Sequence, residues 1–95
     1  MRGEDVAYFY FEERTTFAVT ANDMEHILDL SINKLEEQLD PSMFFRVNRQ
    51  MILNVDAIDQ AIPSLKGKIR VMVHPPFKSD IINKRRPGVR FQVMA

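Results

Sequence analysis

The chain has 95 residues, of which 45% are hydrophobic and none is cysteine. This length suits one domain with a modest core, so we expect a single domain over residues 1–95. The cysteine-free composition excludes disulfides and thiolate metal sites, and no apolar run approaches the roughly 18 residues that span a membrane. Since the first residues also lack the apolar stretch of a signal peptide, we expect a soluble, cytoplasmic protein.

The formal net charge is zero, but the charges are divided unequally along the chain. Residues 1–43 hold three basic and ten acidic side chains, a net of −7, whereas residues 44–95 hold ten basic and three acidic ones, a net of +7. A basic half can give one face a positive potential toward phosphates while the acidic half keeps the protein soluble. Ordinary solvation of the surface by charges explains the same division about equally well.

Most of the chain shows the patterns of β-strands. Residues 5–11 form a continuous apolar run rich in β-branched and aromatic side chains, which favours a buried strand. A polar turn at residues 12–16 then predicts an antiparallel return. The further strands that we expect lie at residues 17–20, 24–30, 55–62, 68–74 and 81–82.

One segment changes from strand spacing to helical spacing. Ser31 is a candidate N-cap, and Ile32, Leu35 and Leu39 recur behind it at helical intervals. Pro41 pushes the residue before it out of the helical region and so ends the helix. The sequence therefore predicts a mainly β fold of antiparallel sheets with one short amphipathic helix.

Residues 44–54 combine apolar ends with a polar centre. The polar side chains in this segment are Arg46, Asn48, Arg49 and Gln50. Arg, Asn and Gln can each make two hydrogen bonds to a planar edge, which suits bases and phosphates but is costly when they are buried unpaired. We therefore predict an edge that contacts nucleic acid here, although Arg46 is as readily explained by packing its stem along the protein.

Four short motifs occur along the chain in the order typical of one family. They are Asp-x-x-Tyr-Phe at residues 5–9, Phe-Phe-Arg-Val-x-Arg at 44–49, Met-Ile-Leu-Asn at 51–54 and Asn-Lys-Arg-Arg at 83–86. Together with the short Leu-rich helix, they resemble the LytTR-type DNA-binding domain, the output domain of many bacterial response regulators. The resemblance implies a mainly β fold without a helix-turn-helix, whose loops enter successive major grooves of DNA.

By position, the resemblance places the DNA-contacting side chains in three clusters. The predicted contact residues are Arg14, Thr15 and Thr16, then Asn48, Arg49 and Gln50, and finally Asn83, Lys84, Arg85 and Arg86. Arg49 suits a bidentate contact to guanine, and Asn48 or Gln50 suits adenine, whereas the last three basic residues suit phosphates. Family members usually have His where this chain has Asn48, and many have Ser-Arg where it has Asn83-Lys84, which leaves the target sequence open. Residues 87–94 match the usual terminal helix only loosely, so we leave strand and helical turn open there.

The resemblance implies partners as well as a fold. We expect sequence-specific binding of double-stranded DNA in transcription regulation, with paired domains on repeated half-sites. Such domains commonly follow a phosphoacceptor receiver domain, which these 95 residues do not contain, so a fragment of a longer two-component regulator is one interpretation.

We predict no enzyme activity, no cofactor and no metal. The sequence has no Ser-His-Asp order, phosphate-cradling Gly-rich loop or metal-ligand spacing, and His26 and His74 are isolated. Two alternatives stay open: a module that binds single-stranded nucleic acid through the aromatic residues 8–11, and a protein-interaction module that uses exposed strand edges.

Overall fold

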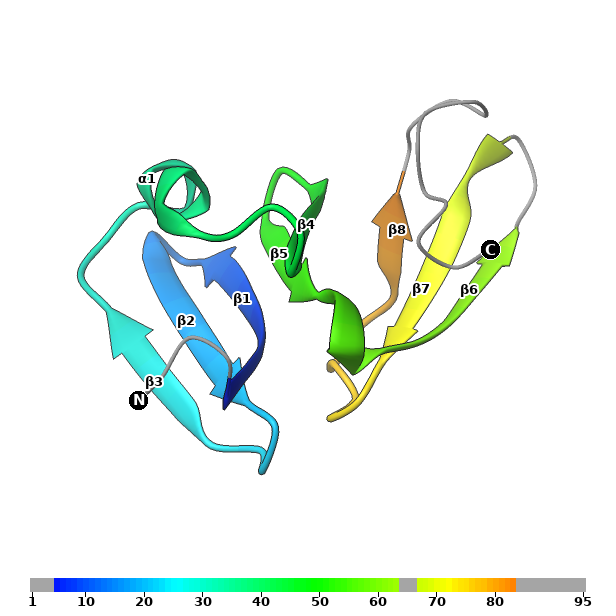
Figure 1. Ribbon diagram of the computed structural model, residues 1–95, viewed down its shortest axis with the longest axis horizontal. Coiled ribbons are helices and arrows are strands. Elements are labelled where there is room, and N and C mark those ends of the chain that lie inside the picture. The colour runs from blue at the N-terminus through cyan, green and yellow to red at the C-terminus, as the bar shows by residue number, and fades with distance from the viewer. Residues whose placement is uncertain (1–4, 64–66, 84–95) are drawn as a thin grey trace.

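The structure is a computed structural model that describes residues 5–63 and 67–83. Two antiparallel sheets make up most of it, one with the strand order β3-β2-β1-β5-β4 and one with the order β6-β7-β8 (Figure 1). The strands are β1 (Val6–Glu12), β2 (Thr15–Thr20), β3 (Glu25–Leu28), β4 (Phe44–Asn48), β5 (Met51–Asn54), β6 (Ile58–Pro63), β7 (Ile69–Val73) and β8 (Ile81–Asn83). The predicted mainly β fold of antiparallel sheets is confirmed.

The central strand β1 is buried on both of its faces. Tyr8 and Tyr10 belong to a core shared with the three-stranded sheet, whereas Phe9 belongs to a core shared with Ile32 and Leu35 of α1 (Ile32–Gln38). The helix and the second sheet therefore cover opposite faces of the first sheet (Figure 1). This double cover explains why the strand has a continuous apolar sequence instead of an alternating one.

The helix begins where the sequence predicted it. Ser31 has extended backbone angles, and its Oγ accepts a hydrogen bond from the Lys34 backbone N–H at 3.2 Å, as an N-cap does. The helix ends at Gln38, ahead of Pro41. No helix among the described residues is long and apolar enough to cross a membrane.

The predicted strand at residues 55–62 is wrong for its first three residues. The chain there forms a 3-10 turn, η2 (Val55–Ala57), before β6 begins at Ile58. The reason is Asn54, whose Oδ1 accepts from the Asp56 N–H at 2.9 Å and whose Nδ2 donates to the Val6 carbonyl at 2.9 Å. This buried amide ties the end of β5 to β1 and caps the turn, a role that strand spacing does not reveal.

Strand β7 (Ile69–Val73) of the second sheet follows its predicted alternation. In β7, Val71 and Val73 are buried and Arg70 and Met72 are exposed. A cis peptide bond joins His74 to Pro75. The chain then turns back, and the Phe77 ring meets the Tyr8 and Tyr10 rings edge-on, at centroid distances of 5.7 and 5.0 Å. The segment after Asn83, including the predictions made for residues 87–94, lies outside the described residues.

The two buried tyrosines give the fold a testable pH dependence. Burial raises the pKa of Tyr8 and of Tyr10 from 10.0 to about 12, and the hydrogen bond that Tyr10 donates to Glu25 adds to its shift. Because the folded state holds these protons more tightly than the unfolded state, the free energy of unfolding should fall as the pH rises from about 10 to about 12. Urea denaturation over this range should show a steeper decline for the natural chain than for the Tyr8→Phe, Tyr10→Phe double variant. Equal slopes for the two proteins would contradict this assignment.

Candidate nucleic-acid interface

The segment at residues 44–54 is a β-hairpin made of β4 and β5. Its apolar ends lie in the core, with Phe44, Val47 and Met51 all buried. Its polar centre forms the tight connection between the strands, in which Arg49 and Gln50 are exposed. We call residues 48–50 the β4–β5 turn. The sequence pattern of polar residues between apolar ones thus corresponds to a turn held out from two buried strands.

The Arg46 side chain connects the backbone of this turn to α1. Its Nε donates to the Asn48 carbonyl at 2.7 Å, and its Nη2 donates to the Arg49 carbonyl at 2.5 Å. Its Nη1 donates to Glu36 Oε1 at 2.7 Å and to Asn33 Oδ1 at 3.1 Å, both on α1. These bonds use four of the five guanidinium N–H groups. Arg46 therefore holds the turn to the helix instead of projecting as a free cation.

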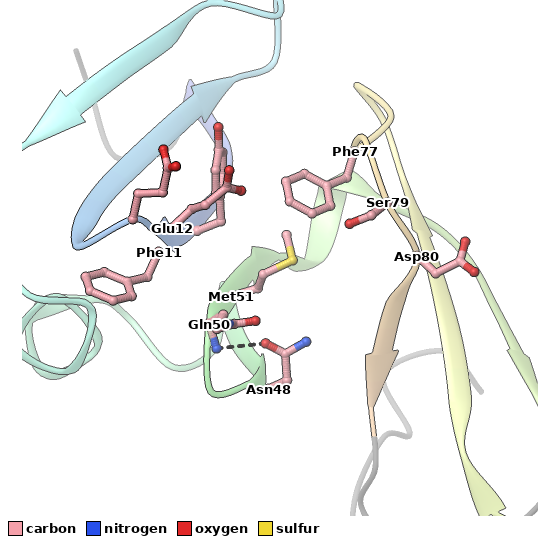
Figure 2. A pocket seen from close by; sticks show the side chains of 10 residues that line it. Phe11, Glu12, Asn48, Gln50, Met51, Phe77, Ser79 and Asp80 are labelled. Atoms are coloured by element: carbon pink, nitrogen blue, oxygen red, sulfur yellow. Dashed lines mark hydrogen bonds between the residues drawn. The ribbon is translucent and has the colours of Figure 1, made fainter.

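The Asn48 side chain holds the turn from within. Its Oδ1 accepts a hydrogen bond from the Gln50 backbone N–H at 2.8 Å, which closes the turn (Figure 2). Its Nδ2 donates to the Ile82 carbonyl of β8 at 3.3 Å. Asn48 consequently joins the β4–β5 turn to the second sheet.

Two hydrogen bonds place the first two predicted clusters, and Asn83 of the third, along one edge of the molecule. The Phe11 N–H donates to the Gln50 carbonyl at 2.8 Å, so the end of β1 lies beside the β4–β5 turn. On the other side, the bond between Asn48 and Ile82 sets the end of β8 beside the same turn. The β1–β2 turn, the β4–β5 turn and the end of β8 therefore succeed one another along this edge (Figure 1).

An open groove of about 1140 Å³ runs along this edge. The described residues that line it are Phe11, Arg46, Val47, Asn48, Arg49, Gln50, Asp80, Ile82 and Asn83. Exposed polar side chains thus border a surface that is open to a large ligand.

A comparison with protein-family models matches the LytTr DNA-binding domain to residues 1–86. The chain belongs to the LytTR family. Among solved structures, it is similar to one described as the LytTr DNA-binding domain of a methyl-accepting/DNA response regulator from Bacillus cereus. The two share 18% sequence identity and superpose with a TM-score of 0.73 over 82% of this chain and 71% of the other. A comparison with curated proteins gave no match.

Membership in this family of DNA-binding domains supports DNA binding in transcription regulation. The predicted contact residues of this LytTR domain differ in their access to solvent. Arg14, Arg49 and Gln50 are exposed, while Thr15 and Asn48 are half-buried. Arg14 stands at a positive φ of 62° in the β1–β2 turn. These three exposed residues are therefore accessible to a large ligand.

Two of the predicted contact residues are buried in the LytTR domain. Thr16 is 2% exposed and Asn83 is 1% exposed, so in this structure their side chains are not accessible to an external ligand. The remaining predicted residues, Lys84, Arg85 and Arg86, lie outside the described part of the chain.

A smaller cleft of about 260 Å³ adjoins the groove and has acidic walls. Figure 2 shows Glu12 on one side of it, and Phe77, Ser79 and Asp80 on the other. Lys78 pairs with Glu12 at 2.6 Å and lies 5.5 Å from the centre of the Tyr10 ring, so this cation is already neutralised. The acidic lining therefore disfavours an anion in this cleft. The described residues include no group of three or more His, Cys, Asp or Glu that could hold a metal ion.

Sequence reasoning missed the contribution of α1 to this edge. Neither Asn33 nor Glu36 has a sequence signal that points to Arg46, because both simply occupy the outer face of an amphipathic helix. The acidic wall at Asp80 was missed for a similar reason, since it depends on how Phe77 folds the β7–β8 connection back.

The two roles of Asn48 are separable by substitution. Asn48→Ala removes both hydrogen bonds and should lower the free energy of unfolding by about 1–3 kcal/mol, with faster hydrogen exchange at the Gln50 amide. Asn48→Asp keeps the oxygen that accepts from Gln50 but loses the donor to Ile82, so the Gln50 amide should stay protected. Amide exchange followed by nuclear magnetic resonance makes the comparison. Equal exchange rates at Gln50 in the two variants would contradict the assigned role of Asn48 Oδ1.

Proposed function

We propose that this LytTR domain binds duplex DNA sequence-specifically in bacterial transcription regulation, and that it reads the major groove with side chains of its turns. The observation that carries this proposal is the braced β4–β5 turn. Arg46 and Asn48 fix its backbone, while Arg49 and Gln50 remain exposed. A turn whose backbone is already ordered loses less entropy when its side chains engage a ligand.

The proposed contacts follow from the chemistry of the exposed side chains. Strand β5 also pairs with β1 in the five-stranded sheet, so the β4–β5 turn, and not the whole hairpin, is the part proposed to enter the major groove. Arg49 is the proposed bidentate partner of guanine, and Gln50 is the proposed partner of adenine. Arg14, at the neighbouring turn, is a further proposed base-reading residue. The basic residues 84–86 are proposed to bind phosphates, which orient the protein without reading sequence.

The proposal includes the larger assembly that the family resemblance implies. Residues 1–95 act as one DNA-binding domain, and two such domains occupy repeated half-sites about one helical turn apart. In a longer regulator, a receiver domain controls this binding.

The two alternatives fare differently against the structure. Binding of single strands by stacking needs exposed aromatic rings, but Tyr8, Phe9 and Tyr10 are 3%, 3% and 6% exposed. One observation supports a protein-interaction surface. Met24, just before the edge strand β3, and Ile27, within it, are 55% and 73% accessible.

The proposal is tested by selecting bound duplexes from a random pool and measuring two variants on the recovered site. Arg49→Ala should weaken binding to that site by about 1–3 kcal/mol and weaken random DNA less, because its contact distinguishes bases. Lys84→Ala should weaken both about equally and reduce the salt slope by about one, because it contacts a phosphate. Affinities measured by fluorescence titration at several salt concentrations provide both quantities.

Three outcomes would contradict the proposal. Equal effects of the two variants would refute the division of roles between bases and phosphates. A preference for single strands over duplex in the same titration would favour the stacking alternative. No binding to any duplex at low salt, together with capture of a protein partner through β3, would favour the interaction module.

A further inference from the structure

A chain of contacts leads from α1 through Arg46 to the β4–β5 turn. Glu36 Oε1 lies 2.7 Å from Arg46 Nη1, and Asn33 Oδ1 lies 3.1 Å from the same atom. The other side of the guanidinium donates to the Asn48 and Arg49 carbonyls. The helix therefore contacts the backbone of the turn indirectly, through one planar cation.

The geometry of a guanidinium makes this link a positioning device. Its N–H groups form a rigid, planar fork, so fixing Nη1 also fixes the directions of Nε and Nη2. Glu36 is the only anion in the described contacts of Arg46, and it therefore anchors the fork most strongly. When the guanidinium is fixed in this way, the Asn48 and Arg49 carbonyls that accept its hydrogen bonds are fixed as well.

Glu36 also pairs with the positive charge of Arg46 beside the groove. Arg46 lines the same open groove as Arg49 and Gln50, and its side chain is 17% exposed. If the ion pair with Glu36 is lost, the positive charge of Arg46 is no longer neutralised beside this groove. A cation of that kind attracts phosphates of any sequence, which raises binding to random DNA.

We propose that Glu36 is a positioning residue that sets how well this domain discriminates between DNA sequences. It acts through Arg46 in two ways. It fixes the β4–β5 turn, and it neutralises a charge that would otherwise attract the phosphates of any DNA sequence. This inference rests on the proposed function. It assigns to α1, whose buried face covers the first sheet, a second role in the selectivity of the interface.

The chain offers a closely matched control for this proposal. Glu37 is the next residue of the same helix and is exposed like Glu36, but about 100° of helical rotation turns it to a different direction. Glu36→Gln and Glu37→Gln change the net charge equally, so any general electrostatic effect on DNA binding is shared. The difference between the two variants isolates the contact with Arg46.

The experiment measures affinity for a selected duplex and for random duplex across a salt series. Relative to Glu37→Gln, Glu36→Gln should reduce the ratio of specific to random affinity by roughly 3- to 10-fold, the scale of the difference between a charge-assisted and a neutral hydrogen bond. Its salt slope on random DNA should become steeper, by up to about one, as Arg46 engages a phosphate. Glu36→Ala should have a larger effect than Glu36→Gln, because the amide oxygen of Gln still accepts a hydrogen bond.

A measurement without DNA separates this inference from the proposed function. Hydrogen exchange at the Gln50 amide should accelerate in Glu36→Gln but not in Glu37→Gln, while thermal melting of both variants stays close to that of the natural chain. Unchanged exchange at Gln50, or equal discrimination by the two variants, would overturn the positioning role. If the natural chain itself shows no preference for any duplex although Gln50 exchange responds as expected, the proposed function fails and its extension to selectivity fails with it.

Discussion

The burial of β1 on both faces is the constraint on which the rest of the structure depends. A strand of this kind needs one layer of cover on each side, and α1 and the three-stranded sheet supply them. The antiparallel pairing of β1 with β5, in which Tyr10 lies opposite Met51, then brings the end of β1 to the start of β5. The β1–β2 and β4–β5 turns consequently meet at one edge, where Asn48 adds the end of β8.

At this edge the structure divides the polar residues between two tasks. The side chains of Arg46 and Asn48 make hydrogen bonds within the protein. The side chains of Arg49 and Gln50 are exposed at the surface. Two arginines three residues apart thus have opposite roles, because one faces the carboxylate of Glu36 and the other faces solvent. This division gives the LytTR domain a hydrogen-bonded turn backbone that displays exposed polar side chains.

The features that the sequence predicted are those with a local cause. The run in β1, the Ser31 cap and the alternation in β7 all depend on residues close together in the chain. The polar centre of residues 44–54 was located for the same reason. The burial of Asn83 and the bond between Glu36 and Arg46 depend on which elements pack together, and a single sequence contains no local pattern for that. The segments of the candidate interface were thus predicted from the sequence, whereas the hydrogen bonds between them were not.

The most direct test of this account is a nuclear magnetic resonance titration of the isotope-labelled domain with a selected duplex. If the edge described above binds DNA, the largest amide shift changes should fall at Arg49 and Gln50, with further changes at Arg14 and beyond the end of β8. The amide shifts of strand β3, at the edge of the first sheet opposite β4, should be unaffected. Changes centred on β3, with none in the β4–β5 turn, would contradict the account.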